Sequence, residues 1–216
     1  MLTLSIARSY ITQNAARLYT TTTMASQNRP LLVAVVGVGL VGSEFIRQLL
    51  SIRAPSPFRL IALSSSSRIL FTGKESPITA DKASEWKSLL ASSAARSDLK
   101  QLTAQLSALV EDNERVALVD NTSSEEVASF YPTWLKAGIH VVTPNKKAFS
   151  GEKELYESIL QAAKESGARF LNESTVGAGL PIIAPLKELL ATGDKVRFPF
   201  IYFKKKHELF CAGKKN

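Results

Sequence analysis

The sequence predicts an α/β fold in which a doubly wound parallel sheet carries helices on both faces. Residues 31–36 (LLVAVV) form a continuous apolar run rich in valine, which is typical of a strand buried on both faces of a sheet. Helical patterns alternate with four further short apolar runs along the chain. Three glycines with the spacing G-x-G-x-x-G separate the first apolar run from the first helical pattern.

Gly37, Gly39 and Gly42 each have a physical reason to be glycine. Gly37 permits a tight turn, Gly39 lets the backbone approach a pyrophosphate, and Gly42 lets helix and strand pack closely. The pattern at 45–53 predicts an amphipathic helix, whose free N–H groups and positive dipole end favour an anion. The order of strand, glycines and helix predicts a Rossmann-type dinucleotide-binding domain. The alternative is a turn without a ligand.

The second apolar run, residues 58–63, predicts the next strand, and its end suggests which cofactor is bound. An NAD-preferring site should place an acidic residue there to hold the ribose hydroxyls. Residues 64–68 instead read Ser-Ser-Ser-Ser-Arg. Small hydroxyl groups and the Arg68 guanidinium suit a 2′-phosphate, so NADP is favoured over NAD. The alternative is a polar loop in which Arg68 points to solvent.

Residues 71–82 are expected to be a loop, and 84–92 and 98–109 to be helices, with Trp86 assigned to packing. A third buried strand is predicted at 116–120, and Asn121-Thr122-Ser123 follows its carboxyl end, where ligands bind in open α/β sheets. Ser123 and Glu126 also have capping-box spacing, and Gly138 can close the helix that follows them. Ser123 is therefore a candidate for binding or for capping.

The remaining elements continue the alternation. Strands are predicted at 139–142 and 168–171, and helices at 151–166 and 181–190. A loop with two glycines joins the last strand to the last helix.

Composition and charge exclude several classes of protein. The 45% apolar content is ordinary for a globular domain, and no apolar run reaches the roughly 20 residues of a membrane helix. The net charge of +8 belongs to the two ends of the chain, because residues 30–196 contain 18 basic and 18 acidic side chains. A nucleic-acid partner therefore has little support. The single cysteine, Cys211, excludes a disulfide framework and fits a reducing compartment.

Three segments are expected along the chain. Residues 1–29 contain no acid and resemble a mitochondrial presequence, the alternative being a disordered leader, so a mitochondrial or a cytoplasmic location is expected. Residues 30–196 form the NAD(P)-binding domain. Residues 197–216 form a divergent basic tail in which Pro199 opposes a central strand.

Four motifs in this order closely resemble homoserine dehydrogenase of the fungal type: GVGLVG at 37–42, VDNTSS at 119–124, TPNKKAF at 143–149 and ESTVGAGLPII at 173–183. The resemblance covers roughly residues 30–196. It implies a Rossmann domain followed by a substrate and dimerisation domain. It also implies reversible reduction of L-aspartate 4-semialdehyde to L-homoserine with NAD(P)H, in threonine and methionine biosynthesis.

The resemblance further implies roles for individual residues. The glycine loop, with Val38, Leu40 and Val41, would hold the pyrophosphate. Thr122 and Ser123 would lie beside the nicotinamide half, and Lys146 would contact the cofactor or the reacting oxygen. By default, a lysine in a turn is simply exposed.

A structural sodium ion is also implied by the resemblance. Its ligand positions match Glu173, Val176, Ala178 and Leu180, largely as carbonyl donors. Oxygen ligands suit a hard cation. The alternative for Glu173 is an ordinary carboxylate at a strand end.

After Val196 the chain departs from the family pattern. The substrate and dimerisation domain, with the lysine that donates a proton to the alkoxide, has no counterpart in residues 197–216, which resemble out-of-frame or retained-intron sequence. A truncated chain with little dehydrogenase activity, and no firm basis for the family homodimer, is therefore expected. A non-catalytic NADP-binding module is the alternative.

Two other dehydrogenase classes fit poorly. Aspartate-semialdehyde dehydrogenase chemistry needs a cysteine nucleophile, and residues 1–210 contain none. Short-chain dehydrogenases need Tyr-x-x-x-Lys, but Tyr131 and Tyr156 are followed at that offset by Leu135 and Leu160.

Overall fold

The computed structural model describes residues 29–151 and 153–193. The chain divides into two compact units, residues 1–171 and 172–216. The leader and tail predicted at the two ends lie outside the described residues, apart from Arg29, and the predicted domain limits stay predictions.

The first unit is built on a six-stranded sheet of order β3-β2-β1-β4-β5-β6. Its strands are β1 (Leu31–Val36), β2 (Phe58–Ser64), β3 (Ile69–Phe71), β4 (Val116–Asp120), β5 (His140–Val142) and β6 (Phe170–Leu171). All neighbouring pairs are parallel except β2 with β3. The predicted α/β class and mostly parallel Rossmann-type sheet are confirmed, whereas the antiparallel edge strand β3 was not predicted.

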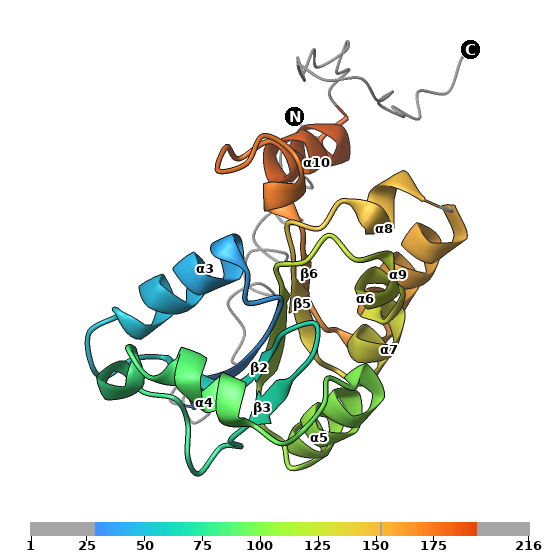
Figure 1. The fold of residues 1–216 in the computed structure, drawn as a ribbon. Coiled ribbons are helices and arrows are strands. Elements are labelled where there is room, and N and C mark those ends of the chain that lie inside the picture. The colour runs from blue at the N-terminus through green and yellow to red at the C-terminus, as the bar shows by residue number, and fades with distance from the viewer. Residues whose placement is uncertain (1–28, 152, 194–216) are drawn as a thin grey trace. The chain divides into compact units, whose positions relative to one another are not determined.

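Helices cover both faces of this sheet (Figure 1). One layer contains α3 (Leu40–Leu50) and α4 (Trp86–Ser92). The other contains α5 (Leu99–Glu111), α7 (Tyr131–Lys136) and α9 (Lys153–Ser166). Three short elements complete the described part of the unit: the 3-10 turn η1 (Ala80–Lys82), α6 (Glu125–Ser129) and α8 (Lys147–Ser150).

Strand β1 is apolar at every position because both of its faces are covered by helices. Leu32, Ala34 and Val36 pack into the core beneath α5, α7 and α9, and Val33 and Val35 pack into the core beneath α3 and α4. Because successive side chains of a strand point to opposite faces, a strand covered on both faces must be apolar at every position.

The helical region after β4 differs from the prediction in two ways. Ser124, not Ser123, is the N-cap of α6, and its hydroxyl accepts the Val127 N–H at 3.3 Å. The helix is also divided at Phe130, because Pro132 has no N–H to continue the hydrogen-bond ladder. The helix predicted at 151–166 is observed as α9, from Lys153 to Ser166, and the short helix α8, which precedes residue 151, was not predicted.

The second unit is described over residues 172–193. It contains the 3-10 turn η2 (Glu173–Thr175) and α10 (Ile183–Ala191). In the part of the chain that the structure describes, no helix is both long and apolar enough to cross a membrane.

His140, at the start of β5, is a titratable group built into the sheet. Its Nδ1 accepts the backbone N–H of Arg169 at 2.9 Å. Burial, followed by the charges of Arg169 and Arg115, lowers the pKa of His140 below its usual value. The folded protein therefore favours the neutral imidazole.

We predict that the free energy of unfolding decreases as the pH falls from 8 to below the ordinary histidine pKa of about 6.5. In that range His140 binds a proton in the unfolded chain but not in the folded protein. The contribution of His140 to the free energy of unfolding is therefore complete above the pKa of the unfolded state and is lost as the pH falls toward the lower pKa of the folded state. Denaturant unfolding at several pH values measures this slope.

His140→Asn should reduce that slope, since the amide oxygen can accept the Arg169 N–H and does not titrate. His207→Gln, which removes the other histidine of the sequence, is the matched control. Equal slopes in the wild type and His140→Asn would contradict the prediction.

Candidate functional site

The glycine loop between β1 and α3 is packed so closely that two of its three glycines have no room for a side chain. Gly37 has φ +88°, and a Cβ there would lie 2.6 Å from Thr122 Cγ2. A Cβ on Gly42, which lies inside α3, would lie 1.9 Å from the carbonyl oxygen of Gly37. A Cβ on Gly39 would meet no atom within 4 Å. Gly37 and Gly42 are therefore required by the fold, whereas the space beside Gly39 is open to a ligand.

The amino-terminal end of α3 is suited to an anion. Gly39 is its N-cap and offers no side-chain acceptor, and the first turn contains no acidic residue. The ladder begins with the Ser43 N–H bonded to the Gly39 carbonyl at 2.8 Å, so the N–H groups of residues 40–42 have no partner in the ladder. Together with the helix dipole, they form an anion-binding end.

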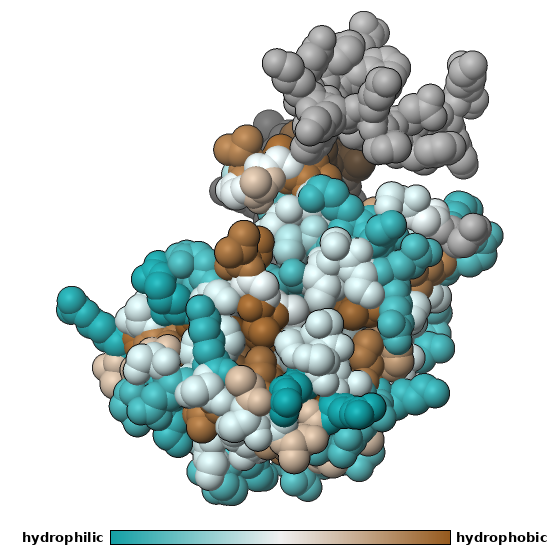
Figure 2. All heavy atoms as spheres, in the orientation of Figure 1, coloured by the Kyte–Doolittle hydropathy of each residue, from teal (hydrophilic) through white to brown (hydrophobic). Residues whose placement is uncertain are grey.

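Apolar side chains lie exposed at this same end of the helix. Leu40 is 94% and Val41 is 60% exposed. Figure 2 shows hydrophobic surface gathered there, next to more hydrophilic surface along the outside of the helix layers. The rim of the predicted pyrophosphate site is therefore apolar.

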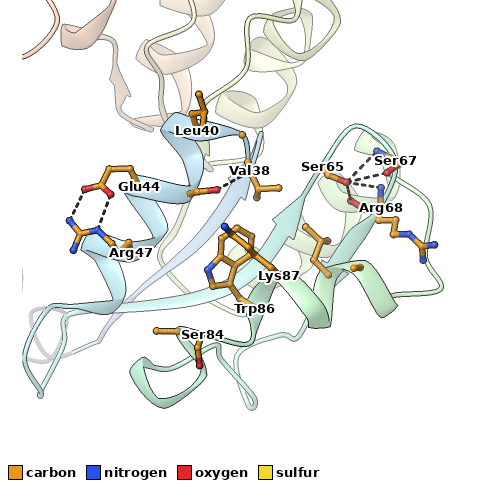
Figure 3. Close-up of a pocket in the computed structure, with 15 residues that line it drawn as sticks. Val38, Leu40, Glu44, Arg47, Ser65, Ser67, Arg68, Ser84, Trp86 and Lys87 are labelled. Carbon is orange, nitrogen blue, oxygen red and sulfur yellow. Dashed lines mark hydrogen bonds and ion pairs between the residues drawn. The ribbon is translucent and has the colours of Figure 1, made fainter.

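A cavity of about 1000 Å³ extends from the glycine loop toward the ends of β2 and α4 (Figure 3). Its lining combines Val38, Gly39 and Leu40 with the turn after β2 and the first turns of α4. On the α3 side, hydrogen bonds from Arg47 lower the pKa of Glu44 to about 2. This pair leaves the wall next to the glycine loop without net charge.

The turn after β2 is organised by Ser65. Its hydroxyl accepts the N–H groups of Ser67 at 3.3 Å and Arg68 at 3.0 Å. Arg68 lines the cavity, but its guanidinium donates to the Ser93 carbonyl and points away from the labelled residues of α3 (Figure 3). Arg68 is thus at the predicted place, and its charged group lies at the rim.

Sequence reasoning missed a second cation in this cavity. Lys87 on α4 lines it, with Nζ 5.5 Å from the ring centroid of Trp86. No carboxylate of the described residues forms an ion pair with Lys87. Trp86 is buried and packs in the core, as expected. No local motif marks Lys87, because only the packing of α4 brings it to the cavity.

The carboxyl ends of β4 and β5 form the other part of the candidate site. Thr122 and Ser123 follow β4, and Lys146 follows β5, which pairs with β4. Ser123 and Lys146 are exposed, and neither side chain has a hydrogen-bond or ion-pair partner among the described residues. Lys147 instead forms an ion pair, with its Nζ 3.8 Å from Oε2 of Glu125. The two strand ends therefore present a free hydroxyl and a free ammonium group.

A buried cluster lies beneath these loops and was not predicted. Asp120 is fully buried, and its carboxylate accepts hydrogen bonds from the Thr122 N–H at 2.7 Å, the Asn145 amide at 3.0 Å and the Tyr131 hydroxyl. Burial, together with the charge of Asp120, raises the pKa of Tyr131, which keeps the phenol as a donor. Sequence reasoning assigned Asp120 only to the end of a strand.

One buried donor close to the glycine loop lacks a partner. The side-chain amide nitrogen of Asn121 is buried and makes no hydrogen bond within residues 29–151 and 153–193. Asn121 lies at the β1–β4 switch point, since its backbone N–H donates to the Val36 carbonyl at 2.8 Å. Buried polar groups are usually paired, so this unpaired donor fits a site that a bound polar group completes. The glycine loop and this donor suit a dinucleotide at the crevice where strand order reverses.

The Glu173 loop is described within the second unit alone. The Glu173 carboxylate accepts the N–H groups of Ile182, Ile183 and Ala184 at 2.5, 2.7 and 3.0 Å, so it caps α10. No group of three or more His, Cys, Asp or Glu side chains in the described ranges is arranged to hold a metal ion. Ala178 has φ +54°, and the carbonyls of Val176, Ala178 and Leu180 accept no hydrogen bond from described residues. Donors for a cation in this loop would thus be mainly these carbonyls.

Comparison with known proteins connects this arrangement to one family. Residues 37–173 match the model of the NAD-binding domain of homoserine dehydrogenase. Homoserine dehydrogenase of Emericella nidulans is 43% identical over 168 residues, covering 77% of this chain and 45% of the relative. That of Schizosaccharomyces pombe is 38% identical over 179 residues, covering 80% and 46%. The chain thus spans under half the length of these relatives.

A solved structure agrees. A hyperthermophilic archaeal homoserine dehydrogenase in complex with NADPH is 28% identical, with a TM-score of 0.51 over 74% of this chain and 49% of that chain. The family match includes the glycine loop and the ends of β2, β4 and β5 described above. This chain therefore belongs to the homoserine dehydrogenase family and contains its NAD-binding domain.

Proposed function

We propose that this chain supplies the cofactor-binding half of a homoserine dehydrogenase and that its cofactor is NADP(H). The observation that carries the proposal is the glycine loop at the β1–β4 switch point, with open space at Gly39 and an uncapped α3, in a chain of this family. The reaction would interconvert L-homoserine and L-aspartate 4-semialdehyde, a step of threonine and methionine biosynthesis.

The three parts of the cofactor would bind to different elements. The pyrophosphate would lie against residues 37–42, where the free N–H groups of α3 face an anion. The adenosine half would occupy the cavity between the glycine loop and α4. The nicotinamide half would lie at the ends of β4 and β5, beside Thr122, Ser123 and Lys146.

The turn after β2 supports NADP over NAD. It contains hydroxyl groups and no carboxylate, and Arg68 and Lys87 both line the adjacent cavity. A 2′-phosphate would draw the Arg68 guanidinium from its neutral partner, the Ser93 carbonyl, because a charge-assisted hydrogen bond is the stronger one.

In the oxidation of homoserine, the substrate would lose a hydride to the nicotinamide and a proton from its hydroxyl group. NADP supplies the hydride acceptor when bound. Lys146 is the residue of this chain that we propose to contact the cofactor or the reacting oxygen, because its ammonium group is exposed at the end of β5 and has no partner among the described residues.

We also propose a structural sodium ion in the Glu173 loop. The free carbonyls of Val176, Ala178 and Leu180 are the candidate ligands, and Glu173 would hold the loop by capping α10. Oxygen donors suit a hard cation.

The acid-free composition of residues 1–29 supports a mitochondrial location, with the cytoplasm as the alternative.

A second candidate is a non-catalytic NADP-binding module. It is favoured by the family match, since residues 37–173 match the NAD-binding domain of the family. Both candidates bind cofactor, so only turnover separates them.

Gly39→Ala should abolish or strongly weaken NADPH binding while preserving the fold. A Cβ at Gly39 meets no protein atom within 4 Å, so stability should change by about 0.5 kcal/mol or less. The methyl group would occupy the space of the pyrophosphate and reduce affinity at least about tenfold. Calorimetric titration and thermal unfolding measure the two effects.

Gly42→Ala is the matched variant in the same loop. Its Cβ would clash with the Gly37 carbonyl, so we expect a loss of about 3 kcal/mol or more in unfolding free energy. If Gly39→Ala binds NADPH as the wild type does, the pyrophosphate does not lie where we propose.

Arg68→Leu should lower affinity for NADPH about tenfold and leave affinity for NADH nearly unchanged, because only NADPH carries the 2′-phosphate. Arg96→Leu is the control, since Arg96 faces Arg68 across a β-bridge but does not line the cavity. Equal losses for both cofactors would instead indicate that Arg68 only supports the turn.

A polypeptide of the 216 residues should oxidise homoserine at least about 10³-fold more slowly than a full-length fungal homoserine dehydrogenase. Lys146 is the one candidate for proton transfer that we find among the described residues at the nicotinamide end. NADPH formation, followed by absorbance, is the measurement. A rate near that of the relatives would contradict this expectation and exclude the non-catalytic module.

A further inference from the structure

We propose that Asp120 and Asn145 form a buried clamp that positions the nicotinamide end of the site. Neither residue would touch the cofactor. The clamp joins the loop after β4, residues 121–124, to the loop after β5, residues 143–147. The inference rests on the proposed function, because it assigns a positioning role at the same site.

The clamp connects backbone atoms of both loops through two side chains. Asp120 accepts the N–H of Thr122 at 2.7 Å and the Asn145 amide at 3.0 Å. The same amide donates to the Ser124 carbonyl at 2.9 Å, and the Asn145 carbonyl oxygen accepts the Lys147 N–H at 3.0 Å. The four bonds therefore bracket Thr122 and Ser123 on one loop and Lys146 on the other.

The clamp is buried and saturated, which makes it rigid. Asp120 is 0% and Asn145 is 3% exposed. Both amide hydrogens of Asn145 and its carbonyl oxygen are used, so the amide has one satisfactory orientation. A buried hydrogen-bonded network in a low-dielectric interior specifies a single arrangement, because a shifted loop would leave a buried charge or amide unpaired.

Tyr131 provides an internal contrast. Its hydroxyl also bonds to Asp120, and it lies 2.9 Å from the hydroxyl of Thr143, the first residue of the second loop, but it forms no hydrogen bond with Thr122, Ser123 or Lys146 among the described residues. Removing this hydroxyl should weaken the cluster and leave the four clamp bonds in place.

The test compares two ligands, NADPH and adenosine 2′,5′-bisphosphate, which lacks the nicotinamide half. Asn145→Ala should weaken NADPH binding about tenfold, as expected for the loss of cross-loop hydrogen bonds. Binding of the bisphosphate should change less than about twofold. Tyr131→Phe should leave both affinities within about twofold of the wild type, even if it lowers the free energy of unfolding as much as Asn145→Ala does.

An exchange variant tests the direct pairing. Asp120→Asn leaves one acceptor oxygen where the carboxylate uses two, so it cannot accept both the Thr122 N–H and the Asn145 amide, and Asn145→Asp places two carboxylates together. The double variant restores a donor and an acceptor between positions 120 and 145, although the bond to the Ser124 carbonyl stays lost, so it should bind NADPH more tightly than either single variant. Failure of this rescue would overturn the clamp as the positioning element.

Hydrogen exchange on the wild type supplies a measurement that needs no variant to fold. NADPH should increase protection of the Thr122 and Lys147 amides, and the bisphosphate should not. If Asn145→Ala weakens both ligands equally, or neither, or if NADPH leaves both amides unchanged, the clamp has only a structural role. A wild type that binds neither ligand would overturn the proposed function and this inference with it.

Discussion

The close approach of α3 to the end of β1 is the constraint on which the described first unit depends. The carbonyl of Gly37 lies where a Cβ on Gly42 would be, and Gly37 in turn lies against the loop after β4. Only glycine allows helix, turn and neighbouring strand to meet at this point. The same contact aims the uncapped end of α3 at the switch point of the sheet, so the requirement of the fold and the requirement of the ligand coincide.

Two kinds of burial surround that point. On both faces of the sheet the core is apolar, and exchange of similar side chains there would be tolerated. Beneath the strand ends the buried groups are polar: Asp120, Thr143 and Asn145. Burying a carboxylate is costly unless it is hydrogen-bonded. The hydrogen bonds that offset this cost also attach the loops after β4 and β5 to the sheet. The buried polar cluster therefore affects the site above it.

The chemical groups of the described residues explain the character of the candidate site. The described residues offer N–H groups, hydroxyl groups, cations and apolar rim surface, all suited to holding a dinucleotide. Orientation of substrate and proton transfer contribute much of the rate of a dehydrogenase. Relatives of this chain are more than twice as long as the part that it matches. Under the proposed function, holding the cofactor is the part of the chemistry assigned to these residues.

The amino-acid sequence by itself determined the fold class, β1 and β4 to the residue, and the glycine loop. These features are local: a strand buried on both faces is apolar throughout, and tight turns demand glycine. The tertiary structure alone decided that Ser124 caps α6, that β3 forms an antiparallel edge, that Lys87 reaches the cavity, and that Asp120 pairs with Asn145. The cap is a local choice between two adjacent serines, but the other features depend on groups brought together by chain folding, and side-chain spacing along one element contains no information on such partners.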